Sequence, residues 1–257
     1  MTVLVERDGG VAVVTIDRQD ALNALDVATL TELRDRLRDL ADDAETRVVV
    51  LTGAGEKAFV AGADIKYMSG LDVNEAKRWG ALGHEAGRLL ETMPKPTIAA
   101  INGFALGGGC ELALACDLRY ASSRARLGQP EINLGIIPGW GGTQRLARAT
   151  SLGFAKDLIF TGRVVDAEEA ERHGLVNAVF DAGDLIAKTM EVASLLASKS
   201  PVAVAYCKDS TNRSLHGDIG SNLVHEADLF SILFSTEDAK EGLGAFTEKR
   251  KANFVGR

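Results

Sequence analysis

The chain has 257 residues, 46% of them hydrophobic and 25% charged, which is ordinary for a soluble globular protein with one large core. The formal net charge of −7 excludes a globally basic nucleic-acid-binding protein, so an anionic ligand would need a local cluster of basic residues. The three cysteines form no Cys-x-x-Cys pair and no Cys/His cluster, which argues against a disulfide framework and a metal site.

The sequence shows no membrane span and no targeting segment. No apolar stretch reaches the length of a transmembrane helix. The first residues, MTVLVERDGG, lack the apolar centre of a signal peptide and the Arg-rich pattern of a transit peptide. Together with the unpaired cysteines, which suit a reducing compartment, this predicts a cytoplasmic location.

The N-terminal part predicts α/β structure. Two β-branched segments, residues 3–5 and 11–16, flank Gly9-Gly10 and predict a hairpin. Asp26 can cap a helix with leucines at helical spacing, and residues 48–51 then have the pattern of a buried strand. The order strand, helix, strand predicts parallel pairing through right-handed crossovers.

The segment FVAGADIK, residues 59–66, contains three small residues that permit close backbone approach, Ala61, Gly62 and Ala63. Asp64 can cap the turn that follows. From spacing alone, an ordinary tight loop is the preferred interpretation of this segment.

A long helix follows. Asp72 with Glu75 has the pattern of a capping box, and the helix should end near Met93. Trp79 and Leu82 on this helix are candidates for the wall of a binding pocket, although packing alone would explain each of them.

The most informative carboxylate in the sequence is Glu111. Residues 97–101 predict a buried strand, Gly107-Gly108-Gly109 interrupt the chain, and residues 110–118 are almost wholly apolar and predict a buried helix. Glu111 therefore lies in the first turn of a helix, beside unpaired N–H groups that favour negative charge. A helix N-terminal acid without a catalytic role has the same pattern.

Glu131 is the second unusual carboxylate. It follows Gly128-Gln129-Pro130 and precedes an apolar stretch that ends in Pro138-Gly139. We expect non-helical backbone here because of the proline. A carboxyl among apolar groups would have a raised pKa and exchange protons near neutral pH, whereas a surface turn acid would not. Two such acids beside glycine-rich chain favour paired general acid/base chemistry.

Other chemistries find little support. The glycines do not match G-x-G-x-x-G, and neither the P-loop motif nor G-x-S-x-G occurs. Cys110 has no evident base beside it. The four histidines are scattered along the chain and lack neighbouring nucleophiles.

The C-terminal part is mainly helical. Ser151 can cap a helix over residues 152–160, and Asp166 with Glu169 resembles another capping box. Residues 176–180 predict one more short strand. From residue 185 the pattern is helical almost throughout, and the last part is too thin to hold a core of its own. We therefore divide the chain into a core at 1–195 and a C-terminal region at 196–257.

Two segments carry a specific family resemblance: NGFALGGGCELALACD at residues 102–117 and GQPEINLGIIPGWGGTQRL at 128–146. They resemble the crotonase superfamily, and within it the enoyl-CoA hydratases. Further similar segments lie in the same order as in that family, so the resemblance covers nearly the whole chain. They are ALNAL at 21–25, FVAGADIK at 59–66, LIFTGR at 158–163, AEEAERHGLVN at 167–177 and EGLGAFTEKRKANF at 241–254.

The resemblance implies a fold and an assembly. The core would be a spiral of repeated β-β-α units, and the C-terminal helices would form a trimerisation region. Such chains usually assemble as dimers of trimers, that is, as homo-hexamers.

The resemblance also implies roles for site residues. The N–H groups of Ala63 and Gly108 would form an oxyanion hole for a thioester carbonyl. Glu111 would act as the base toward water, Glu131 as the acid toward the α carbon, and the N–H of Gly139 would help to hold the water. Trp140 occupies a position that varies in the family, and no chemistry is assigned to it.

Coenzyme A contacts are implied for two groups of residues. The first comprises Ala24, Ala61, Asp64, Ile65 and Lys66. The second is the basic run Lys249-Arg250-Lys251, whose Lys249 would meet coenzyme A phosphates, partly those of a neighbouring subunit. A solvated helix end would explain this run equally well.

The implied reaction is the reversible syn addition of water to a 2-trans-enoyl-CoA. It needs no metal and no redox cofactor, and coenzyme A is part of the substrate. The nearest alternatives are a double-bond isomerase, a hydratase of branched or aromatic enoyl-CoA, and a thioester hydrolase. A non-catalytic acyl-CoA-binding or scaffold protein and a nucleic-acid-binding protein are alternatives of other classes, disfavoured by the two acids and by the net charge.

Overall fold

The computed structural model describes all residues, 1–257, and contains two β-sheets built by a spiral path of the chain. The larger sheet has the strand order β1-β2-β3-β5-β7-β10, in which only β1 and β2 pair antiparallel. Its strands are β1 Val3–Asp8, β2 Val11–Ile16, β3 Val48–Gly53, β5 Thr97–Ile101, β7 Leu118–Ser122 and β10 Ala178–Phe180.

The smaller sheet has the order β4-β6-β8-β9, with β8 and β9 antiparallel and the other pairs parallel. Three times in succession the chain places one strand in the larger sheet and the next in the smaller one, and then forms helical structure. This is the repeated β-β-α unit that the family resemblance led us to expect. The strands are β4 Ala58–Val60, β6 Phe104–Leu106, β8 Arg126–Gly128 and β9 Val164–Asp166.

Helices cover the sheets, and most begin where the sequence predicts. The capping box of Asp72 and Glu75 is present, and the side chain of Asp26 caps the first helix. The helices and 3₁₀ segments of the body are η1 Gln19–Ala21, α1 Val27–Asp42, α2 Ile65–Met68, α3 Val73–Thr92, α4 Gly108–Ala115, η2 Pro130–Leu134, α5 Gly142–Ala149, α6 Leu152–Thr161 and α7 Ala167–Arg172.

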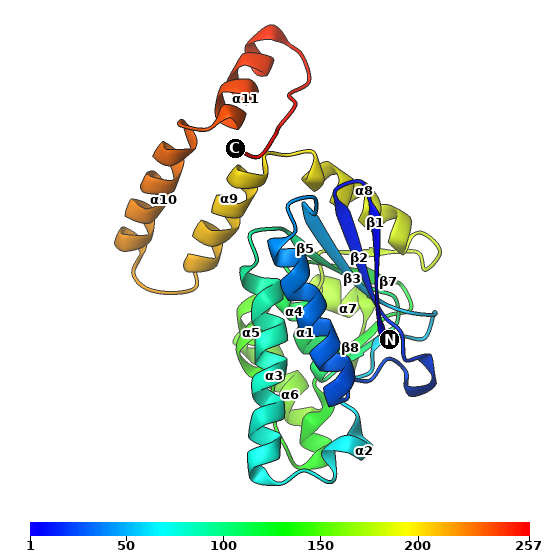
Figure 1. Cartoon of the computed structure of the whole chain (residues 1–257). Helices are drawn as coiled ribbons and strands as arrows, with labels where there is room; N and C mark the ends of the chain where they lie inside the picture. The colour runs from blue at the N-terminus through cyan, green and yellow to red at the C-terminus, as the bar shows by residue number, and fades with distance from the viewer.

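Helix α4 lies at the centre of the body (Figure 1), and all eight of its residues are buried. The largest apolar cluster of the protein surrounds it and includes the leucines of α1 that face the larger sheet. A polar side chain on α4 is therefore held in an apolar environment, and this decides the chemistry of Glu111.

The C-terminal helices form an arm that projects from the body. Helix α8 Leu185–Ala197 lies against the larger sheet, while α9 Pro201–Arg213, α10 Ile219–Leu233 and α11 Glu237–Glu248 extend away from it (Figure 1). Neither α9 nor α10 has a buried residue. Lys208 fastens α9 to the body, because its Nζ pairs with Asp117 at 2.8 Å and donates to the carbonyl of Leu90 at 2.9 Å.

Several element predictions need correction. The helix expected over residues 110–118 ends at Ala115, and Leu118 already begins β7, since apolar composition alone does not separate a buried helix from a buried strand. Asp166 caps α7 through the N–H of Glu169, but the reciprocal bond of a capping box is absent. The last strand begins at Ala178, two residues later than expected.

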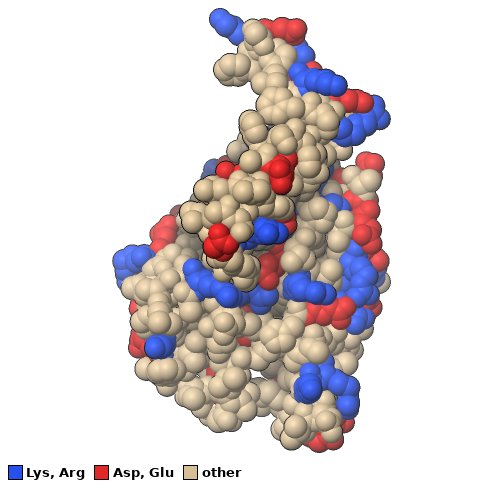
Figure 2. Space-filling view, turned by 90° about the vertical axis from the view of Figure 1, so that its left-hand side faces the viewer, with Lys and Arg blue, Asp and Glu red and all other residues tan.

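Two surface properties bear on partners. No helix is both long enough and apolar enough to cross a membrane. On the face shown in Figure 2, acidic and basic side chains are interspersed over the body and the arm, so this face carries no continuous basic surface.

Replacing Gly109 with alanine tests the packing around α4. A Cβ there would lie 2.0 Å from the carbonyl oxygen of Val60, so backbone would have to move. We expect Gly109→Ala to lower the free energy of unfolding by about 1–3 kcal/mol, as overpacking does. In the matched control Gly153→Ala, the Cβ meets nothing within 4 Å, and stability should be unchanged or slightly higher. Urea denaturation measures both; equal stabilities would contradict this packing.

Candidate active site

Three consecutive glycines allow three different groups to reach the start of α4. Gly107 has φ +49°, and a Cβ on it would lie 2.6 Å from Oε1 of Glu131. A Cβ on Gly108 would lie 2.3 Å from the indole of Trp140. A Cβ on Gly109 would lie 2.0 Å from the carbonyl oxygen of Val60. The triple glycine therefore serves close packing of an acid, an aromatic ring and a strand around one helix end.

Glu111 is held in place by backbone donors. Its side chain is only 2% exposed, and its Oε1 accepts hydrogen bonds from the N–H groups of Trp140 and Gly142, each at 2.7 Å. Burial raises the pKa of Glu111, and these two N–H groups together with Arg145 counteract the rise. The carboxylate is thus a fixed acceptor with one oxygen not engaged by these donors.

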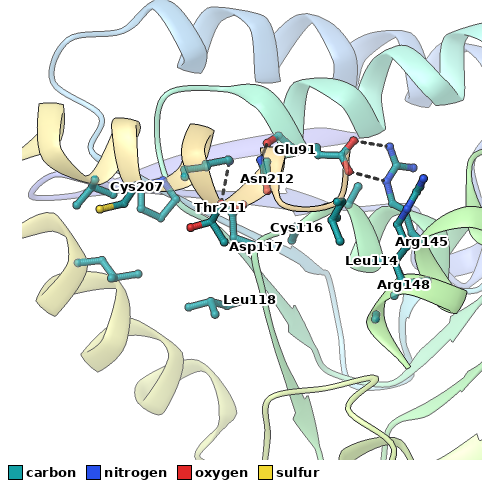
Figure 3. Close-up of a pocket in the computed structure, with 17 residues that line it drawn as sticks. Glu91, Leu114, Cys116, Asp117, Leu118, Arg145, Arg148, Cys207, Thr211 and Asn212 are labelled. Carbon is teal, nitrogen blue, oxygen red and sulfur yellow. Dashed lines mark hydrogen bonds and ion pairs between the residues drawn. The ribbon is translucent and has the colours of Figure 1, made fainter. Parts of the chain in front are cut away.

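Arg145 positions the loop that donates to Glu111. Its Nη1 donates to the carbonyl of Trp140 at 2.9 Å, and its Nη2 pairs with Glu91 of α3 at 2.9 Å. Figure 3 shows Glu91 and Arg145 facing each other. No role was predicted for Arg145 or for the N–H groups of Trp140 and Gly142; the run GWGGTQR ahead of a helix was the available signal.

Glu131 lies in a helical turn, contrary to our expectation of non-helical chain. It belongs to the 3₁₀ segment η2, in which Pro130 takes the first position. The residue that avoids the α region is the one before the proline, Gln129, with φ −122° and ψ 75°. The avoidance of helical backbone before a proline therefore applies to Gln129 and not to Glu131.

The environment of Glu131 favours its protonated form. Burial raises the pKa of Glu131 to about 7, and the neighbouring charge of Glu111 adds to the rise. With its amide NH₂ group turned toward the carboxyl, buried Gln129 donates to both oxygens of Glu131 at 3.2 and 3.3 Å, which opposes the rise because donors stabilise the ionised carboxylate. The two carboxyls thus interact and differ in their partners, which suits one base and one acid.

Two residues whose backbone N–H groups have no partner in the chain, Ala63 and Gly108, line the same cavity. Ala63 forms an isolated parallel bridge with Leu25, and its N–H donates to no other group of the chain. Gly108 is the first residue of α4, where no N–H has an intrahelical partner, and Gly107 provides no side-chain cap. Gly62, with φ +114°, turns the chain so that this arrangement forms.

The cavity has a volume of about 390 Å³ and brings together most of the residues that the sequence singled out. Trp79 lines it as expected, whereas Leu82 packs against the core and does not. The predicted site residues that line the cavity are Ala61, Ala63, Ile65, Gly108, Glu111, Glu131 and Gly139.

Other predicted binding residues lie outside the cavity lining. Ala24 and Asp64 are near its entrance and are linked by Arg18, which donates to the carbonyl of Ala24 and to Asp64. Asp64 also caps α2, and Lys66 on that helix is exposed. Lys249 follows α11 at the far end of the projecting arm (Figure 1). A single chain therefore does not bring Lys249 to the cavity.

A second cavity, of about 400 Å³, lies between α4, α5 and α9 (Figure 3). Its charged groups are largely paired within the chain, as Glu91 is with Arg145 and Asp117 with Lys208. No group of three or more His, Cys, Asp or Glu side chains is arranged to hold a metal ion. The first cavity is therefore the candidate active site.

Comparisons with known proteins agree with this geometry. A family model described as enoyl-CoA hydratase/isomerase matches residues 6–257. A short-chain-enoyl-CoA hydratase of Clostridium acetobutylicum is 51% identical over 97% of this chain and 95% of its own length. A crotonyl-CoA hydratase of Syntrophomonas wolfei is 48% identical over 99% and 98%.

The structural comparison gives the same result. The crystal structure of an enoyl-CoA hydratase from Bacillus anthracis covers the whole of both chains with a TM-score of 0.97 and 41% identity. The protein belongs to the enoyl-CoA hydratase/isomerase family and has the crotonase fold.

Titration of Glu131 tests the electrostatics of the site. We expect its carboxyl to titrate near pH 7, and Glu111→Gln to lower this midpoint because a neutral amide does not repel the Glu131 charge. Carbon-13 NMR of the glutamate carboxyls measures both, with Glu131→Gln assigning the signal. Glu241 is an internal reference, since Arg250 lowers its pKa to about 2. A Glu131 midpoint near 4.5 would contradict the proposed environment.

Proposed function

We propose that the protein is an enoyl-CoA hydratase that adds water reversibly to a short 2-trans-enoyl-CoA and forms a 3-hydroxyacyl-CoA. The observation that carries the proposal is the pairing, in one cavity, of two interacting carboxyls, buried Glu111 and half-buried Glu131, with two unpartnered backbone N–H groups. The names of the relatives from Clostridium and Syntrophomonas support it. Such a lyase belongs to fatty acid β-oxidation or related acyl-CoA catabolism.

The two N–H groups provide the electrophilic part of the mechanism. The thioester carbonyl accepts hydrogen bonds from Ala63 and Gly108, and both donors are fixed by backbone before the substrate binds. As water adds to the β carbon, negative charge moves onto the carbonyl oxygen. Losing one preorganised donor to such an oxyanion typically costs roughly 3–4 kcal/mol of transition-state stabilisation.

The two carboxyls move the protons. Glu111, kept available by its two donors, accepts a proton from the water as the new C–O bond forms. Glu131 delivers its proton to the α carbon. A proton then returns from Glu111 to Glu131, so the enzyme is regenerated. Because hydration needs Glu131 protonated and Glu111 ionised, its rate should fall as the pH rises through about 7. Dehydration starts from the same total number of protons on the two carboxyls, so its rate should fall over the same range.

The remaining parts of the substrate contact other groups. The N–H of Gly139, in the cavity wall, helps to hold the water. Coenzyme A runs along the entrance formed by Ala61, Ile65 and Lys66, next to Ala24 and Asp64. Charge stabilisation comes from backbone donors and proton transfer from carboxyls, so the scheme uses no metal and no redox cofactor.

Replacing either carboxyl by its amide tests the mechanism. We expect Glu111→Gln and Glu131→Gln each to lower kcat by about 10²- to 10⁴-fold, because each removes one proton-transfer group. Loss of the conjugated enoyl-thioester absorbance of crotonyl-CoA measures the rate. Glu56→Gln is the matched control, since the side chain of Glu56 is 89% exposed and does not line the cavity. An unimpaired glutamate variant would refute the assigned roles.

We also propose that residues 196–257 are an assembly region and that the chain forms a hexamer in the cytoplasm. Helix α10 has no buried residue and exposes Leu223, Val224 and Phe230, and Phe234 is exposed just after its last turn. In such an assembly, Lys249 can reach the coenzyme A bound to a neighbouring subunit.

The mass in solution tests this assembly. Light scattering should give six times the chain mass of 27.3 kDa. Phe230→Asp should lower that mass, because it places a charge on the exposed apolar face of α10. A stable 27.3 kDa monomer in the parent protein would contradict the assembly.

A further inference from the structure

We propose that the indole of Trp140, supported by Trp79, closes the inner end of the acyl pocket and restricts the substrate to short acyl chains. This inference rests on the proposed function and adds the residue that sets its selectivity. Both tryptophans line the active-site cavity and are among its most buried walls, with exposed fractions of 5% for Trp140 and 6% for Trp79.

The indole of Trp140 occupies the space between two helices. A Cβ on Gly83 of α3 would lie 2.3 Å from the pyrrole part of the ring, and a Cβ on Gly108 of α4 would lie 2.3 Å from its benzene part. Two glycines on facing helices therefore leave room for this one side chain. Because both helix backbones contact the ring, it cannot shift to admit a longer chain without moving them.

Trp79 fixes the ring from a third side. The two indoles meet edge to face, with centroids 5.2 Å apart and an interplanar angle of 90°. Tyr67 of α2 packs on Trp79 in turn, at 5.4 Å and 69°. The wall thus runs from α2 across α3 to α4, and each aromatic pair has a favourable geometry.

The position of the wall relative to the catalytic groups gives the direction of the acyl chain. The indole of Trp140 contacts Gly108, the proposed oxyanion donor, and the main-chain N–H of Trp140 donates to Glu111. The bulky coenzyme must leave through the exposed side of the cavity, where Ile65 is 56% exposed. The acyl chain beyond the β carbon therefore points toward the two buried tryptophans.

The side chain and the backbone of Trp140 have separable functions. The donor to Glu111 is the main-chain N–H, which any residue except proline provides. Shortening the side chain should therefore change the size of the pocket more than the proton chemistry. In apolar pockets one methylene changes kcat/KM by roughly 10- to 200-fold, so a removed indole should shift the chain-length profile measurably.

The test compares the parent with Trp140→Ala and Trp140→Met across 2-enoyl-CoA substrates of four, six, eight and ten carbons. In the parent, kcat/KM should fall at least about tenfold between six and ten carbons. In both variants the ratio of ten-carbon to four-carbon kcat/KM should rise at least about tenfold. Trp140→Phe, which keeps an aromatic ring between Gly83 and Gly108, is the matched control and should shift the ratio less.

Binding provides a readout that does not depend on turnover. Calorimetry measures the affinity for saturated butanoyl-CoA and decanoyl-CoA. The parent should bind decanoyl-CoA more weakly than butanoyl-CoA, and this difference in affinity should be smaller in Trp140→Ala. If the cavity left by alanine unfolds Trp140→Ala, Trp140→Met still tests the proposal, because methionine fills irregular gaps in a core.

Two outcomes would overturn the inference. A parent that hydrates and binds ten-carbon chains as well as four-carbon chains would show that the chain leaves elsewhere, past exposed Ile136 and Ile137 at the rim. An unchanged ratio of ten-carbon to four-carbon kcat/KM in the folded variants would show that Trp140 does not limit the acyl chain length. If the parent hydrates none of the substrates but binds butanoyl-CoA more tightly than decanoyl-CoA, the proposed function is wrong and the proposed role of Trp140 is still supported.

Discussion

The structure depends on the close contacts that the first turn of α4 makes with the neighbouring acid, aromatic ring and strand. Side chains at Gly107, Gly108 and Gly109 would collide with Glu131, Trp140 and Val60. Their absence lets a buried helix N-terminus, with its unpaired N–H groups, meet an acid and an aromatic ring at contact distance. The helix end is thus both a packing centre and the electrostatic centre of the site.

Two similar carboxyls become different because of what surrounds them. Glu111 is the more deeply buried, but two short backbone hydrogen bonds stabilise its charge. Glu131 lacks such donors on its carboxyl other than Gln129, and it faces the charge of its neighbour. The proton therefore belongs on Glu131. The loop that provides the two donors is fixed in turn by Arg145 and Glu91, which extends the catalytic arrangement to α3 and α5.

Local signals in the sequence predicted much of this fold. Capping at Asp26 and Asp72, the leucine spacing of α1 and the strand at 97–101 depend on near neighbours, and the structure confirms them. Strands of three residues, such as β6 and β8, carry too few residues for a periodic pattern and were missed. Resemblance to a family supplied the oxyanion donors, which spacing alone did not distinguish from an ordinary loop.

The features of the site that the sequence did not predict depend on contacts between distant segments of the chain. Glu111 binds the N–H of Trp140, 29 residues later in the chain, and neither local segment indicates this bond. A triple glycine likewise shows that something must approach, but not that an acid, an indole and a carbonyl do so at successive positions. Trp140 was therefore left without a role by its sequence and acquires one only from its neighbours on α3 and α4.

In the proposed mechanism, Glu111 and Glu131 act from one cavity on the same face of a substrate whose carbonyl is fixed by Ala63 and Gly108. The most direct test is hydration of crotonyl-CoA in heavy water, followed by NMR analysis of the 3-hydroxybutyryl-CoA formed. We expect a single deuterium on the α carbon, added to the same face as the hydroxyl group. Deuterium on the opposite face, or on both faces during initial turnover, would contradict it.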